Sequence, residues 1–129
     1  MDRSRLHVAV IDDDESVRRA LSRLLRAANL DADTFASGRD FIDSLAAQVP
    51  DCVVLDVHMP GMNGLDVQLQ LVRSGFRIPV VVITGHDEPQ ARAQCLAAGA
   101  AAYLRKPLDD VALLDAIHHA AHAAGQRTA

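Results

Sequence analysis

The sequence lacks any apolar run long enough to cross a membrane and has no signal-peptide pattern. A membrane-spanning helix needs about 20 predominantly apolar residues in succession. We therefore expect a soluble cytoplasmic protein that makes no membrane contact.

Positive charge is scarce: 13 Lys and Arg residues stand against 17 Asp and Glu, which gives a net charge of −4. A nucleic-acid surface needs clustered basic side chains to neutralise phosphates. We therefore expect no nucleic-acid contact by this chain.

Cysteine and lysine are also rare. Cys52 and Cys95 are the only cysteines, they stand in apolar surroundings, and they form no CxxC motif. Reduced, buried thiols are thus favoured over a disulfide or a zinc site. Lys106 is the single lysine among the basic residues. Arg is strongly preferred at the other basic positions. The single lysine therefore suggests a role that a compact ammonium group fills better than a planar guanidinium.

The chain contains 129 residues, half of them apolar, which suits one domain with a sizeable core. Strand-like and helix-like segments alternate about five times with short loops between them. This alternation predicts an α/β fold: a parallel sheet with right-handed helical crossovers and helices on both faces. The expected strands are residues 7–11, 31–35, 53–56, 78–84 and 101–104, and the expected helices are residues 16–28, 38–47, 65–73, 88–98 and 109–124. In the last helix, the apolar residues expected on one face are Val111, Leu114, Ile117 and Ala121.

One strand end dominates the pattern. The apolar residues 53–55 lead directly into Asp56, and a loop rich in Pro, Gly and Asn follows at residues 59–64. Asp12 and Asp13 follow the first strand, Thr84 ends the fourth, and Lys106 follows the fifth. Ligands of open α/β sheets bind at the carboxyl ends of the strands, so these side chains are expected to converge.

The chemistry of this set is consistent with phosphoryl transfer. Clustered carboxylates suit Mg²⁺, which prefers oxygen ligands and substrate phosphates. The Asp56 carboxylate can then attack phosphorus as a nucleophile. Lys106 can supply a fixed positive charge and Thr84 a hydroxyl donor to the charged phosphoryl oxygens.

Four motifs resemble, in order and spacing, those of the receiver domains of two-component response regulators, the CheY-like superfamily. The resemblance covers about residues 6–122. The motifs are Ile11-Asp12-Asp13, then Asp56-Val57-His58-Met59-Pro60 with Gly64 after it, then Ile83-Thr84-Gly85, and finally Lys106-Pro107. The segments Thr84-Gly85-His86 and Lys106-Pro107-Leu108 are most similar to receivers of FixJ/NarL-like transcriptional regulators.

The resemblance implies a five-stranded, doubly wound, flavodoxin/CheY-like sheet in the order 2-1-3-4-5. It implies that Asp56 accepts a phosphoryl group from the phosphohistidine of a sensor histidine kinase. It also implies Mg²⁺ ligation by Asp13, Asp56 and the backbone carbonyl of His58, with Asp12 acting mainly through water.

Further roles follow from the same resemblance. Thr84 and Tyr103 match the pair of residues that move on phosphorylation in this family. The hydroxyl of Thr84 would turn toward the phosphoryl group, and the ring of Tyr103 would follow it inward. Lys106 would pair with the phosphoryl group, and a cis peptide bond is implied between Lys106 and Pro107. His58 and His86 occupy variable positions that affect how long the phosphoryl group survives.

The expected output is phosphorylation-dependent homodimerisation through the face built from residues 88–98, 101–104 and 109–124. In this interpretation residues 1–124 form the receiver domain of a transcriptional regulator, and residues 125–129 form a flexible tail or the start of a linker. A stand-alone receiver that acts by protein–protein contact is the alternative.

Other functions fit the sequence less well. A phosphatase of the haloacid-dehalogenase type would carry a second Asp where His58 stands. A flavin or nucleotide binder would need a Gly-rich or hydroxyl-rich phosphate cradle after the first strand, where four acidic residues stand instead. His118, His119 and His122 could in principle bind a metal, but a solvent-facing helix end is the simpler interpretation.

Overall fold

The computed structural model describes residues 5–127. Strands and helices alternate along the chain as the sequence predicts, with boundaries that differ by a few residues. The strands are β1 (His7–Ile11), β2 (Asp31–Phe35), β3 (Cys52–Asp56), β4 (Val80–Thr84) and β5 (Ala102–Arg105). The helices are α1 (Glu15–Ala27), α2 (Gly38–Ser44), α3 (Gly64–Arg73), α4 (Pro89–Ala97) and α5 (Asp110–Arg127).

The strands form one parallel sheet in the order β2-β1-β3-β4-β5, which confirms the predicted fold. Every residue of β3 and β4 is buried, as expected for central strands covered on both faces. The edge strands β2 and β5 are more exposed. The apolar strands therefore lie at the centre, and Asp56 ends one of them.

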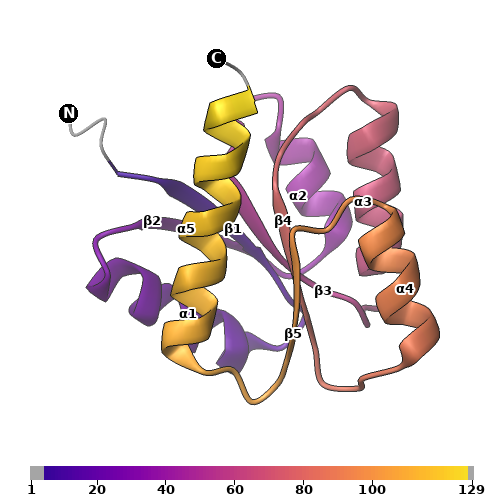
Figure 1. The fold of residues 1–129 in the computed structure, drawn as a ribbon, viewed down its shortest axis with the longest axis horizontal. Coiled ribbons are helices and arrows are strands. Elements are labelled where there is room, and N and C mark those ends of the chain that lie inside the picture. The colour runs from indigo at the N-terminus through magenta and orange to yellow at the C-terminus, as the bar shows by residue number, and fades with distance from the viewer. Residues whose placement is uncertain (1–4, 128–129) are drawn as a thin grey trace.

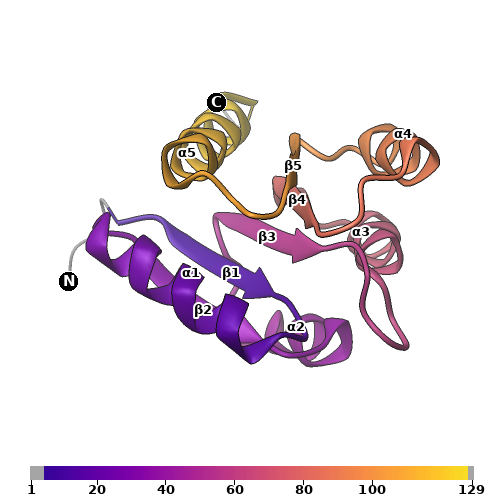
Figure 2. The same cartoon turned by 90° about the horizontal axis from the view of Figure 1, so that it is seen from below.

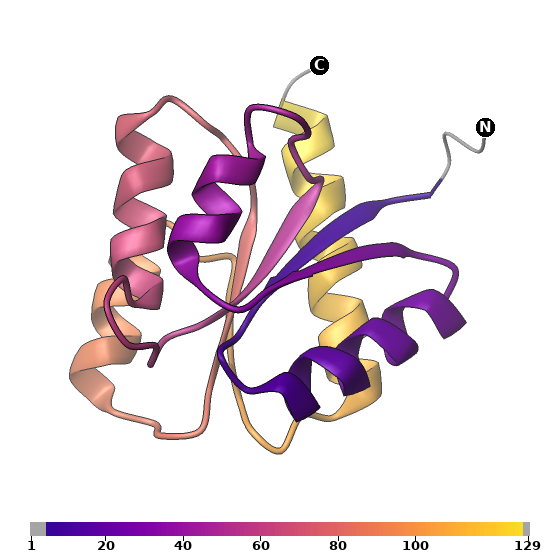
Figure 3. The same ribbon diagram turned by 180° about the vertical axis from the view of Figure 1, so that it is seen from behind.

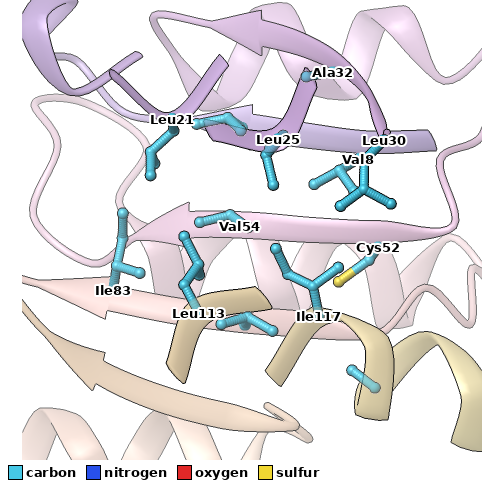
Figure 4. Close-up of a cluster of buried hydrophobic side chains, with 13 residues drawn as sticks. Val8, Leu21, Leu25, Leu30, Ala32, Cys52, Val54, Ile83, Leu113 and Ile117 are labelled. Carbon is cyan, nitrogen blue, oxygen red and sulfur yellow. The ribbon is translucent and has the colours of Figure 1, made fainter. Parts of the chain in front are cut away.

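Helices cover both faces of this sheet (Figures 1 and 2). Helices α1 and α5 share a buried cluster with β1, β3 and β4, to which Leu25, Val54 and Ile117 contribute (Figure 4). Helices α2, α3 and α4 pack on the opposite face around Phe41, Val67 and Cys95, and α2 and α3 lie side by side in Figure 3.

Polar caps determine where the helices after β1 and β3 begin. Asp14 is the N-cap of α1, and its side chain accepts a hydrogen bond from the Ser16 N–H. Asn63 caps α3 in a capping box, in which its side chain accepts from Asp66 N–H and the Asp66 side chain accepts from Asn63 N–H. These caps hold two of the loops that border the carboxyl edge of the sheet.

The apolar face expected for α5 is only partly the buried face, because Ile117 is buried and Leu114 packs against the core but Val111 does not. Leu113, Ile117 and Ala120 are buried, whereas Val111 is 65% exposed. The apolar residues of this helix spread around much of its circumference, so periodicity alone did not select one face. Packing against β3, β4 and β5 selected it.

Helix α5 also extends to Arg127, beyond its expected end at residue 124. A single glycine inside a helix costs only about 1 kcal/mol, so Gly125 need not stop it. Residues 128 and 129 of the expected tail lie outside the described residues.

Both cysteines lie in the core of the fold. Cys52 and Cys95 are free and buried, which confirms the reduced thiols. Burial raises the pKa of Cys52 to about 12 and also raises that of Cys95.

From residue 5 to residue 127, no helix is both long and apolar enough to span a membrane.

Candidate functional site

Three carboxylates meet at the carboxyl edge of the sheet. Ile11 and Leu55 pair in register on the neighbouring strands β1 and β3, so the next residues, Asp12 and Asp56, emerge side by side. One carboxylate oxygen from each of Asp12, Asp13 and Asp56 lies within 4.8 Å of the others. Asp12 and Asp56 are buried and Asp13 is exposed, so the cluster opens to solvent on one side.

Lys106 completes this cluster from the far edge of the sheet. Its Nζ donates to Asp12 Oδ2 at 2.8 Å and lies 3.7 Å from Asp56 Oδ1. Burial lowers the pKa of Lys106, but the hydrogen bond to Asp12 and the charges of Asp56 and Asp12 outweigh it and raise the pKa above its ordinary value. Lys106 is therefore a fixed positive charge beside two carboxylates.

Asp56 is the most perturbed carboxylate of the site. Burial, followed by the charge of Asp12, raises the pKa of Asp56 to about 6, although Lys106 and a backbone hydrogen bond from His58 act in the opposite direction. An unneutralised negative charge at Asp56 is therefore unfavourable, and an additional cation would relieve it.

The donor set suits Mg²⁺. The cluster offers only carboxylate oxygens from Asp12, Asp13 and Asp56, with one side open for water or phosphate oxygens.

Thr84 lies on the strand next to Asp56 but does not bind it. Its buried Oγ1 donates to the His86 carbonyl at 2.8 Å and accepts from the His86 N–H at 3.1 Å. In this arrangement the hydroxyl is engaged with the loop between β4 and α4.

Tyr103 on β5 packs against the cluster beneath α4, and its buried hydroxyl makes no well-formed hydrogen bond within residues 5–127. Burial, followed by the charge of Asp87, raises the pKa of this hydroxyl, whereas the Glu88 backbone and the Thr84 side chain lower it. The aromatic side chain thus has its polar end inside the protein.

Two histidines border the open side of the site. The rings of His58 and His86 meet edge to face with centroids 5.9 Å apart, and His58 Nε2 lies 3.9 Å from Glu88 Oε1. Both residues are exposed. On α5, the side chains of His118, His119 and His122 are also exposed to solvent.

Gly64 allows the loop after Asp56 to fold back tightly. Its N–H donates to the Val57 carbonyl, and a Cβ at this position would lie 2.5 Å from the backbone oxygen of Asp56. Only glycine fits this close approach without displacing the loop.

Sequence reasoning placed Asp12, Asp13, Asp56 and Lys106 together, and the structure brings them together. The Lys106–Pro107 peptide bond is cis. Two contacts were missed: Arg18 donates to the Asp12 carbonyl at 2.8 Å, and the Arg92 guanidinium carbon lies 5.8 Å from the Tyr103 ring centroid. Both arginines stand on helices rich in polar residues, where nothing in the local pattern marks them.

Comparison with known proteins agrees with this geometry. The family model described as the response regulator receiver domain matches residues 8–118. Nodulation protein W from Bradyrhizobium diazoefficiens is 41% identical over 110 residues, which cover 85% of this chain and 48% of that protein. The transcriptional regulatory protein FixJ from Azorhizobium caulinodans is 38% identical, over 87% of this chain and 53% of that protein.

A solved structure gives the same result. The receiver protein from Burkholderia phymatum is 48% identical with a TM-score of 0.81, and the match covers 92% of this chain and 96% of that chain. The chain spans about half the length of the curated relatives it matches. With a matched family model, relatives of this identity and the predicted acidic site at the sheet edge, the chain belongs to the receiver domain family of two-component response regulators.

Proposed function

We propose that Asp56 accepts a phosphoryl group from the phosphohistidine of a sensor histidine kinase. An oxygen of Asp56 forms a bond to phosphorus while the bond from phosphorus to the donor imidazole nitrogen breaks, and the imidazole keeps the electron pair. Receiver domains of response regulators interact with histidine kinases, which supports this choice of donor.

One observation carries the proposal: the Lys106 ammonium lies against Asp12 and Asp56 in a cluster of three carboxylates. Developing negative charge on the transferred group needs such a fixed cation nearby. Lys106 can move its contact from Asp12 to a phosphoryl oxygen on Asp56 because its stem is flexible.

The proposed metal ligands are Asp13, Asp56 and the backbone carbonyl of His58. Asp12 would contact the metal mainly through a bound water molecule. Mg²⁺ bound there would supply positive charge that offsets the carboxylates and the phosphoryl oxygens. His58 and His86, whose rings lie 5.9 Å apart beside the site, are proposed to influence how long the phosphoryl group survives.

Intact-mass measurement after incubation with acetyl phosphate tests this proposal. We expect the parent protein to gain one phosphoryl group only when Mg²⁺ is present, and Asp56→Asn to gain none. Asp115→Asn, a change at an exposed carboxylate on α5, is the matched control and should behave like the parent. Equal uptake by Asp56→Asn, or no uptake by the parent, would contradict the assignment of Asp56.

We propose further that phosphorylation is transmitted through Thr84 and Tyr103 to the face formed by α4, β5 and α5, called the switch face below. Thr84 must release His86 to reach a phosphoryl group, which changes the loop that leads into α4. The exposed apolar side chains of Leu96 on α4 and Val111 on α5 support this face as a homodimer contact.

The relatives support a role in transcription regulation, since two of them are transcriptional regulatory proteins of which the match covers about half the length. We infer that the receiver domain, expected over residues 1–124, runs to the end of α5 at Arg127 and that it is part of a longer regulator with an output domain. A stand-alone receiver remains the alternative. Receiver domains of transcriptional regulators are generally not enzymes, and slow Mg²⁺-dependent phosphorylation and dephosphorylation of Asp56 itself is the only chemistry proposed.

A further inference from the structure

The placement of Tyr103 is unusual for a residue expected to move inward only after phosphorylation. Its hydroxyl is already buried and makes no well-formed hydrogen bond among residues 5–127, although the Glu88 backbone and the Thr84 side chain lie near enough to lower its pKa. Burying a hydroxyl without a partner is unfavourable. Some other contact must therefore favour the inward ring.

The ring has two such contacts. The side chain is partly buried and packs, like that of Ala91, against the buried cluster that includes Cys95 of α4. In addition, the Arg92 guanidinium lies over the ring, 5.8 Å from its centroid. A cation at this distance from an aromatic face is attracted by the negative face of the ring.

No carboxylate in the described part of the chain competes with the Tyr103 ring for the Arg92 guanidinium. Among residues 5–127, no ion pair involves Arg92. The nearby pair of Arg105 and Asp87, at 3.7 Å, uses a different arginine and links β5 to the loop before α4. The guanidinium of Arg92 is therefore available to the ring of Tyr103.

We propose that Arg92 is a positioning residue that holds the Tyr103 ring inward before any phosphorylation takes place. The part of the switch that remains to move is then Thr84, whose hydroxyl is bound to His86. Losing a cation–π contact of this type changes a population ratio about two- to five-fold. Without Arg92, the outward orientation, in which the hydroxyl reaches water, should gain population by that factor.

The composition of the chain makes the test direct. Tyr103 is the only tyrosine, and the sequence has no tryptophan. Tyrosine fluorescence therefore reports on this one ring. Its quenching by acrylamide in the unphosphorylated protein measures how accessible the ring is.

We expect Arg92→Ala to increase the population of the quencher-accessible ring about two- to five-fold, and Arg92→Lys to restore much of the protection because it retains the cation. Arg73→Ala, which removes an exposed arginine from α3, should quench like the parent. Far-UV circular dichroism verifies that each variant is folded. Equal quenching of Arg92→Ala and the parent would overturn the inference, and so would Arg92→Lys quenching as strongly as Arg92→Ala.

The inference rests on the proposed function only in giving Tyr103 a switch role. The quenching experiment needs no phosphoryl group, whereas the mass measurement does not depend on the ring. Failure of one is therefore distinguishable from failure of the other.

Discussion

At the scale of the residue, Asp56 combines a buried position with a crowded electrostatic environment. Burial and Asp12 raise its pKa to about 6, although Lys106 lies 3.7 Å away. The folded protein thus binds a proton at Asp56 more tightly than the unfolded chain, in which an aspartate has a pKa near 3.9. Ionised Asp56 therefore destabilises the fold, fully above about pH 6 and not at all well below pH 4.

Asp56→Asn should consequently stabilise the protein at pH 8 in the absence of Mg²⁺. A difference of about two pKa units corresponds to a gain on the order of 2 kcal/mol in the free energy of unfolding. The gain should shrink as the pH falls from 6 to 4, because the parent carboxylate becomes protonated. Urea denaturation at several pH values measures this.

Asp115→Asn should show no such pH-dependent gain, since Asp115 is exposed and lies outside the cluster. Mg²⁺ should stabilise the parent but not Asp56→Asn to the same extent, because a bound cation offsets the charge that the substitution removes. An Asp56→Asn variant that is less stable than the parent at pH 8 would contradict the electrostatic account.

At the scale of the element, the junction between β3 and α3 positions Asp56. The Asn63–Asp66 capping box starts α3, and the Gly64 N–H binds the Val57 carbonyl immediately after the strand. At Gly64 an added Cβ would lie 2.5 Å from the Asp56 oxygen and 2.9 Å from the Val57 Cα. These atoms are backbone and cannot rotate away.

We therefore expect Gly64→Ala to lower the free energy of unfolding by about 1–3 kcal/mol, the usual range for forced overpacking. It should also slow phosphoryl uptake, because relief of the clash shifts the backbone of Asp56. Thermal denaturation and the intact-mass time course measure the two effects.

Gly85→Ala is the matched control in the loop after β4. The nearest atom to its added Cβ is Lys106 Cδ at 4.0 Å, which is ordinary contact. This variant should keep its stability to within about 0.5 kcal/mol. A Gly64→Ala protein as stable as Gly85→Ala would show that the loop accommodates the extra methyl group.

At the scale of the whole molecule, the switch face differs from the other surfaces in its combination of exposed apolar side chains and proximity to Thr84 and Tyr103. Leu96 is 42% exposed on α4, and Val111 is 65% exposed on α5. Val72 on α3 is exposed to a similar extent, 62%, but it lies outside this face.

Phosphorylation should shift the parent protein from monomer toward dimer in light scattering. Val111→Ser should weaken this dimer because it removes apolar surface from the contact, whereas Val72→Ser should dimerise like the parent. Both variants should take up one phosphoryl group by mass. A phosphorylated parent that stays monomeric at every concentration, or equal weakening by the two valine substitutions, would exclude the proposed interface.

The sequence predicted the sheet and most of the acidic site because both follow from local patterns. Buried strands are recognisable as β-branched runs, and a parallel topology brings their carboxyl ends to one edge. Asp12 and Asp13 could thus be placed beside Asp56 although they follow β1 and Asp56 ends β3. The buried face of α5 could not be predicted in the same way, since its apolar residues allowed more than one face and only packing against the sheet selected it.

The amino-acid sequence by itself determined the alternation of strands and helices, the single acidic edge and the membership of the family, because each depends on residue type and spacing along the chain. Tertiary structure decided which groups are partners. Lys106 contacts Asp12 across 94 residues, Thr84 binds the backbone of His86, and Arg92 covers the ring of Tyr103. Such contacts depend on the distance between side chains from different elements, and that distance exists only once the helices are packed on the sheet.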